Sequence, residues 1–205
     1  MGKVKVKKAD VWIDMTPMSD VMVLLLTFFM LTSTFVKNEA VKVTTPASVS
    51  EIKVPESNVL TILCDNDGKI FLGMDTPGRM GDLITGMASQ YGVSLGKEQL
   101  ENGRGAAVIG VSMQELSTLL GQDSEKMNEY MASRGIPTDS IDGKMSEFQD
   151  WVSIARENNG ADMKIAIKAD SKTPYKTIKK MMSELQDLEE SRYYLITALK
   201  TNSED

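Results

Sequence analysis

One apolar stretch near the amino terminus constrains this chain more than any other feature. Residues 15–36, MTPMSDVMVLLLTFFMLTSTFV, contain a single ionisable side chain, that of Asp20. As an α-helix these 22 residues would extend ~33 Å. The hydrocarbon core of a membrane is ~30 Å thick, so this length predicts a transmembrane helix over 15–36.

Polar residues mark the start and one side of this predicted helix. Asp14 is expected to cap the helix start, and Pro17 lies in the first turn, where its missing N–H has no intrahelical partner to lose. Asp20, Thr27 and Thr34 recur every seven residues, which is close to two helical turns, so they form one polar stripe. Hydroxyl groups inside a membrane seek partners on adjacent helices, and the stripe therefore predicts a protein neighbour.

The position of Asp20 admits more than one interpretation. A carboxylate inside a membrane costs at least ~2.5–3.5 kcal/mol, and such residues are typical of proton or ion pathways. Asp20 could instead cap a shorter helix over 21–36 at the headgroup level, and the threonine hydroxyls could bond back to their own helix. A cleaved signal peptide fits poorly. The charged region before the apolar run would be roughly 20 residues long, and no cleavage site between small residues follows the apolar run.

Residues 13–26, IDMTPMSDVMVLLL, carry a resemblance to a known family. The combination of Thr16-Pro17, an aspartate three residues later and an uninterrupted apolar run resembles the signature of the ExbD/TolR family, single-span subunits of bacterial proton-driven motors. The resemblance implies that Asp20 carries the proton. It also implies a homodimer enclosed by an ExbB/TolQ-like multi-span subunit, acting on a TonB- or TolA-like envelope protein, with peptidoglycan as a further candidate ligand.

The charge distribution predicts the orientation of the chain. Residues 1–14 contain four lysines, although the whole chain has a net charge of −6. Because short lysine-rich flanks stay in the cytoplasm, 1–14 is predicted to be a cytoplasmic tail of a single-pass protein of the bacterial inner membrane. Everything after residue 36 is then periplasmic. The acidic net charge argues against nucleic-acid binding.

The remainder of the chain predicts a linker followed by a folded domain. Residues 37–58 lack a helical period and contain two prolines, which is typical of an extended linker. β-rich runs at 59–64 and 69–72 flank Asp67-Gly68 and predict a β-hairpin. The acidic turn lacks the ligand spacing of a calcium loop, so no metal site is expected. Cys64 has no partner for a disulfide and is expected to be buried.

Helical and strand patterns complete the periplasmic domain, predicted over 59–200 with a tail at 201–205. The predicted helices cover 80–91, 112–121, a segment from 123 or 124 to 135, 143–158 and 173–190, and the predicted strands cover 163–170 and 193–199. Ser112 and Glu115 match a capping box. The methionines are expected to pack in the core, with a groove for a partner peptide as the alternative.

The predicted fold class is a single transmembrane helix plus a small α+β domain, made of a β-hairpin, helices and a strand-helix-strand unit. That last unit is similar to the family's outer domain, with Asp170 expected at the helix start and Tyr175 in packing. Residues 95–160 depart from the family pattern as an apparent helical insertion.

The same residues predict a function without catalysis. The chain has no histidine, so it cannot pair a nucleophile with a histidine base. The sequence also contains no phosphate-binding loop and no cofactor motif. We therefore expect a non-enzymatic motor subunit that couples proton flow through Asp20 to TonB-type transport, without a cofactor. The competing hypothesis is a membrane-anchored module that binds peptidoglycan or a peptide and has no proton role.

Overall fold

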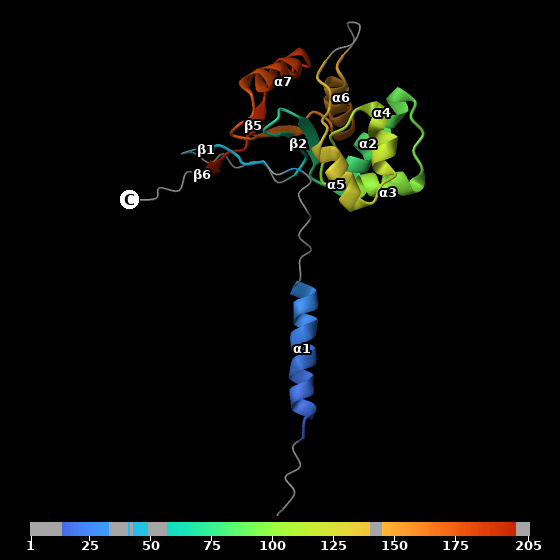
Figure 1. Cartoon of the computed structure of the whole chain (residues 1–205), viewed down its shortest axis with the longest axis vertical. Coiled ribbons are helices and arrows are strands. Elements are labelled where there is room, and N and C mark those ends of the chain that lie inside the picture. The colour runs from blue at the N-terminus through green and yellow to red at the C-terminus, as the bar shows by residue number, and fades with distance from the viewer. Residues whose placement is uncertain (1–13, 33–40, 42, 49–56, 140–144, 200–205) are drawn as a thin grey trace, which may run out of the picture. The chain divides into compact units, whose positions relative to one another are not determined.

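The computed structural model describes residues 14–32, 41, 43–48, 57–139 and 145–199. The chain divides into two compact units, Met1–Asn38 and Glu39–Asp205. The helix α1 (Thr16–Thr32) belongs to the first unit, and the other described elements belong to the second (Figure 1).

The helix α1 has 17 residues, all of them exposed. It begins one residue after the predicted start, and residues 33–36 of the predicted span lie outside the described residues. Judged by length and hydropathy together, none of the helices in the described ranges could cross a membrane.

The second unit is built on a four-stranded mixed sheet with the strand order β3-β2-β4-β5. The antiparallel pair β2 (Val59–Cys64) and β3 (Ile70–Met74) is the predicted hairpin, and the turn between them contains Gly68 at a φ of 83°. The strands β4 (Lys164–Ala169) and β5 (Tyr193–Leu195) continue the sheet in parallel with β2. The predicted α+β class of the domain is confirmed.

Six helices accompany the sheet within the described part of this unit. They are α2 (Pro77–Tyr91), α3 (Lys97–Gly105), α4 (Met113–Leu120), α5 (Ser124–Ala132), α6 (Glu147–Asn159) and α7 (Tyr175–Asp187). Figure 1 shows α2 to α6 gathered on one side of the unit, whereas α7 lies apart from that group, between β4 and β5 in the chain. The helix α3 was not predicted, and α2 begins three residues before its predicted start.

The core of the domain joins the sheet to these helices. Five of the six residues of β2 are buried, and β4 has three consecutive buried residues, Ile165, Ala166 and Ile167, which is the pattern of central strands covered on both faces. Trp151 of α6 and Leu185 of α7 are both 0% exposed. Met113, Met127 and Met131 are also buried, so the prediction that methionines pack in the core is confirmed for these three.

A second, two-stranded sheet joins the two ends of this unit. The strand β1 (Ala47–Ser48) pairs in parallel with β6 (Ala198–Leu199). The prediction of one strand over 193–199 is therefore wrong, because the chain leaves the main sheet after Leu195 and pairs elsewhere. Part of the predicted linker contacts the domain, since Val41 is 7% exposed and belongs to the core cluster.

Two predicted side-chain roles are also wrong. Ser112 stands at the start of α4 but makes no side-chain cap bond. The Glu115 side chain, the other half of the predicted capping box, forms an ion pair with Arg134. The first amide of α4, that of Met113, donates to Glu147 Oε2 at 3.0 Å. Tyr175 is 76% exposed and so does not pack in the core.

Candidate functional site

The start of α1 is organised by Asp14. Its Oδ1 accepts hydrogen bonds from the Thr16 amide at 3.0 Å and from Thr16 Oγ1 at 2.5 Å. The bond from the hydroxyl and then the bond from the amide lower the pKa of Asp14, because both stabilise the charged carboxylate. Pro17 follows as the second residue of the helix. The cap and the proline together define where the helix begins.

Asp20 lies just over one turn into α1 and is exposed. Its carboxylate has no hydrogen-bond or ion-pair partner within the described part of the chain. The residue before it is polar, and the Ser19 hydroxyl donates to Met15 O at 3.1 Å. The residue after it, Val21, begins the apolar run. Asp20 is thus a carboxylate that no other described residue pairs with, at the edge of an apolar surface.

The two threonines of the predicted stripe have different outcomes. Thr27 Oγ1 donates to Val23 O at 3.0 Å and to Leu24 O at 2.9 Å, so its proton is shared within its own helix. This is the alternative that the sequence left open. Thr34 lies outside the described residues. Thr27 is seven residues after Asp20 on the same helix, which places both on one side of α1.

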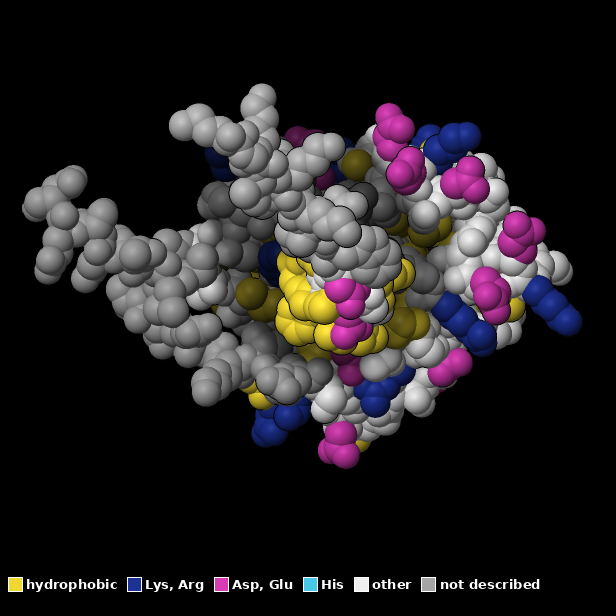
Figure 2. Space-filling view, turned by 90° about the horizontal axis from the view of Figure 1, so that it is seen from below, with side chains coloured by type: hydrophobic (Ala, Val, Ile, Leu, Met, Phe, Trp, Pro, Cys, Tyr) yellow, Lys and Arg dark blue, Asp and Glu magenta, His cyan; other side chains and the backbone are white. Residues whose placement is uncertain are grey.

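The surface of α1 around these residues is apolar. Twelve large hydrophobic side chains of the helix and of the residue before it are between 53% and 88% exposed: Met15, Met18, Val21, Met22, Val23, Leu24, Leu25, Leu26, Phe28, Phe29, Met30 and Leu31. Seen end-on, α1 appears as a ring of hydrophobic side chains with acidic groups over it (Figure 2). Soluble monomers rarely expose so large a contiguous apolar surface, and surfaces of this kind are typical of contacts with another protein or with a membrane.

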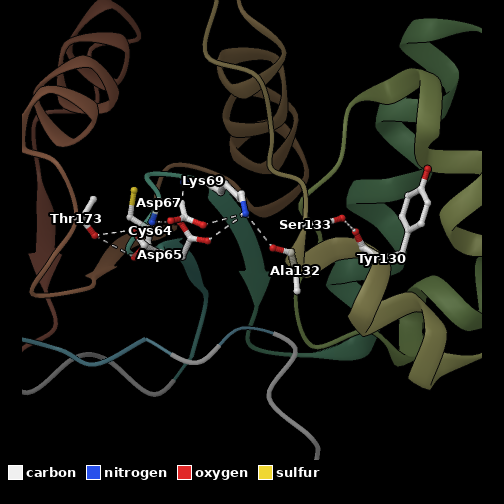
Figure 3. A network of polar contacts seen from close by, with 8 residues as sticks. All are labelled: Cys64, Asp65, Asp67, Lys69, Tyr130, Ala132, Ser133 and Thr173. Carbon is white, nitrogen blue, oxygen red and sulfur yellow. Dashed lines mark hydrogen bonds and ion pairs between the residues drawn. The ribbon is translucent and has the colours of Figure 1, made fainter.

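The acidic turn between β2 and β3 is a structural corner of the domain. Asp65 is 7% exposed, and its Oδ1 accepts from the amides of Asp67 at 2.9 Å and Lys69 at 2.8 Å. Its carbonyl oxygen accepts from Thr173 Oγ1 at 2.7 Å, and Lys69 Nζ donates to Ala132 O at 3.2 Å (Figure 3). The turn therefore connects the hairpin to the segment before α7 and to the end of α5.

The described ranges contain no group of three or more histidine, cysteine, aspartate or glutamate side chains placed to hold a metal ion. Cys64 is 0% exposed and free. Burial, and then the neighbouring charge of Asp65, raise the pKa of its thiol to about 12. A thiol in this state is not a nucleophile near neutral pH.

Sequence reasoning missed one polar centre of the domain. The Arg156 side chain forms an ion pair with Glu190, and its Nη1 also donates to the carbonyl oxygens of Gly160, Ala161 and Met163 at 3.3, 3.0 and 2.7 Å. The pair joins the end of α6 to the segment after α7. Since the partners are 34 residues apart, no local spacing could have predicted it.

Comparison with known proteins gives one match. The family described as Biopolymer transport protein ExbD/TolR matches residues 7–199, which include α1 with Asp20 and the whole described part of the domain. Neither the curated proteins nor the solved structures contain a match.

Proposed function

The chain belongs to the ExbD/TolR family, and from this premise we propose that it is a subunit of a proton-driven motor in a bacterial inner membrane. The resemblance predicted from residues 13–26 is confirmed by this membership. The family is associated with biopolymer transport and is non-enzymatic, so the role of the chain is to energise transport. The further steps below are our proposal.

The first step concerns the membrane. We place residues 15–36, which include α1, across the membrane as a single pass with the four lysines of 1–14 on the cytoplasmic side. The exposed apolar side chains of α1 support this placement, because lipid and partner helices would cover them. An ExbB/TolQ-type multi-span subunit is the proposed protein partner, and a second copy of this chain would complete the membrane part.

The second step concerns the proton. Asp20 has no partner within the described part of the chain, so its carboxylate is available to a proton arriving from the periplasmic side. The charged and neutral forms of an aspartate prefer different surroundings, because the charged form needs water or a polar partner. Each protonation and release would then shift the preferred position of α1 against its partner. Asp20 is the proposed proton relay, Thr27 and Thr34 continue its polar stripe, and Asp14 and Pro17 only set where the helix starts.

The third step concerns the output. The periplasmic domain would transmit the movement of α1 to a TonB- or TolA-like envelope protein, with TonB-type transport as the proposed process. The observation that carries the whole proposal is the Asp20 carboxylate, which is the one ionisable side chain of α1 and has no partner among the described residues.

The proposal is tested by transport in cells that depend on this chain. Asp20→Asn should abolish energised uptake, whereas Asp20→Glu, which keeps a titratable carboxylate, should retain part of it. Asp14→Asn is the matched control, because it removes a carboxylate six residues earlier while asparagine caps helices equally well. Normal uptake by Asp20→Asn, at a normal level of protein, would refute the proposal.

A further inference from the structure

A polar pocket of about 590 Å³ lies where three parallel strands of the sheet begin. Its lining comes from Ser57 and Asn58 before β2, from 161–164 at the start of β4 and from 189–192 before β5, with Arg156 of α6 and Tyr194 of β5. We call it the strand-start pocket. Its volume lies within the range of ~300–1,000 Å³ that is usual for ligand sites.

Two of the charged side chains of the strand-start pocket are already neutralised. Arg156 and Glu190 form an ion pair whose side chains are 26% and 15% exposed. The remaining donor of Arg156 is directed to three backbone carbonyl groups. This pair therefore forms a fixed, electrically neutral part of the wall and is not free for a ligand.

Four other charged side chains of the pocket have no such partner. Lys164, Arg192, Asp162 and Glu189 all line it and are exposed, and none of them forms an ion pair with another described residue. Two are cations and two are anions, so their charges sum to zero. A set with both signs offers a counter-charge to each end of a ligand that carries one group of each sign.

Two residues of the strand-start pocket have a strained, left-handed backbone conformation. Asn58 has a φ of 58° and Glu189 a φ of 61°, and these are the two non-glycine residues with positive φ in the described ranges. Glu189 follows the last turn of α7, a position at which helices usually place glycine. In addition, Asn58 Oδ1 is buried and has no hydrogen-bond partner among the described residues. Strained residues of this kind are concentrated at binding sites. A role in binding would explain why position 189 holds a glutamate, although glycine adopts this backbone conformation without strain.

We propose that the strand-start pocket binds a short peptide with a free amino group and a free carboxylate. Lys164 and Arg192 would receive the carboxylate, and Asp162 and Glu189 would receive the ammonium group. Tyr194 supplies an aromatic surface for the apolar part of the ligand. This site lies in the folded domain, and its function does not depend on the proton step at Asp20.

The first test uses four forms of one dipeptide with the full chain in detergent micelles. Isothermal titration calorimetry compares dialanine, its N-acetyl form, its C-terminal amide and the form blocked at both ends. Dialanine should bind most tightly, and blocking either end should weaken binding roughly fivefold, as the loss of one exposed ion pair does. Equal binding of the doubly blocked form, or no saturable binding of dialanine, would overturn the proposal.

The second test assigns each end of the ligand to its side chains. Lys164→Gln with Arg192→Gln should weaken binding of the N-acetyl form and leave the amide form unaffected, whereas Asp162→Asn with Glu189→Gln should do the reverse. All four side chains are exposed, so the variants are expected to fold. The matched control is Lys97→Gln with Glu98→Gln, which removes an exposed charge of each sign on α3. Equal effects of both pairs on both peptides, or effects no larger than in the control, would contradict the assignment.

A last variant separates binding from folding. Glu189→Gly removes the carboxylate and also relieves the positive φ, so the domain should become more stable while the amide form binds less well. A binding defect in a more stable protein cannot come from misfolding. Unchanged binding of the amide form by this variant would remove Glu189 from the proposed site.

Discussion

Ser146 and Glu184 are joined by a buried hydrogen bond, in which Ser146 Oγ donates to Glu184 Oε2 at 2.6 Å. The two residues are 1% and 8% exposed. Gln149 completes the contact, since its side chain donates to Glu184 O at 3.2 Å and accepts from the Ser146 amide at 3.0 Å. The capping box of α6 is thereby connected to α7, two helices that belong to different parts of the chain.

The buried carboxylate of Glu184 should make the domain less stable as pH rises. Burial raises its pKa above the ordinary value of 4.5, and the charges of Asp139 and Asp187 act in the same direction, whereas Ser146 and Lys180 oppose them. The folded state holds this proton more tightly than the unfolded state, so stability falls as pH increases from about 4.5 through the folded pKa. Glu184→Gln, which keeps an acceptor for Ser146 and cannot ionise, should gain stability over the parent as pH rises.

This prediction is checked by urea unfolding at several pH values, with circular dichroism as the readout. Glu98→Gln is the control, because its side chain is exposed on α3. A difference between Glu184→Gln and the parent that stays constant with pH would show that Glu184 does not titrate in this way.

Replacement of Arg156 by lysine should destabilise the domain by about 2 kcal/mol. A lysine has one ammonium group and cannot reproduce the fork that contacts Glu190 and three carbonyl groups, and hydrogen bonds to charged groups contribute ~1.5–3 kcal/mol. The control is Lys180→Gln, which breaks the ion pair with Asp139, whose side chain is 89% exposed. An exposed pair of this kind contributes less than ~1 kcal/mol. Equal losses in chemical denaturation would contradict the distinction.

Leu185→Ala should cost ~2–5 kcal/mol in the free energy of unfolding. Leu185 is 0% exposed where α7 meets the core, so truncation leaves a cavity. Tyr175→Ala on the same helix removes a side chain that is 76% exposed and should change stability by no more than ~0.5 kcal/mol. The pair is compared by thermal and urea unfolding. A small effect at position 185 would mean that α7 is not anchored as the structure describes.

Cys64 should be unreactive in the folded protein. Burial raises the pKa of its thiol to about 12, so thiolate is scarce near pH 8 and reagents have no access. A maleimide or a chromogenic disulfide should label the full chain slowly, and rapidly only after unfolding in urea. Rapid labelling under native conditions would contradict the burial of β2.

Local patterns predicted much of the domain, and the remaining features depend on distant partners. The hairpin of 59–64 and 69–72 follows from alternation and an Asp-Gly turn, which neighbouring residues specify. In α3, by contrast, the sequence KEQLENGRG has one large apolar residue and no periodic stripe. It packs on α2 through Gly103, where a Cβ atom would lie 2.6 Å from Ile84 Cδ1. Such a close approach is visible only after folding.

Of the two candidate sites, one could be predicted from neighbouring residues and the other depends on distant segments. Asp20 could be predicted because a charge interrupts an apolar run that is continuous in sequence. The strand-start pocket could not, since Asn58, Lys164 and Glu189 meet only when β2, β4 and the end of α7 are assembled. Likewise, the end of the last predicted strand depends on β1, which lies far earlier in the chain.

Proton flux through the assembled membrane complex tests the central role of Asp20 most directly. The full chain is reconstituted with its multi-span partner in lipid vesicles, a pH gradient is imposed, and a dye inside the vesicles reports proton entry. The parent complex and Asp14→Asn should conduct protons, and Asp20→Asn should conduct no more than vesicles without protein. Flux through Asp20→Asn at the rate of the parent complex would contradict the assignment of Asp20 as the proton relay.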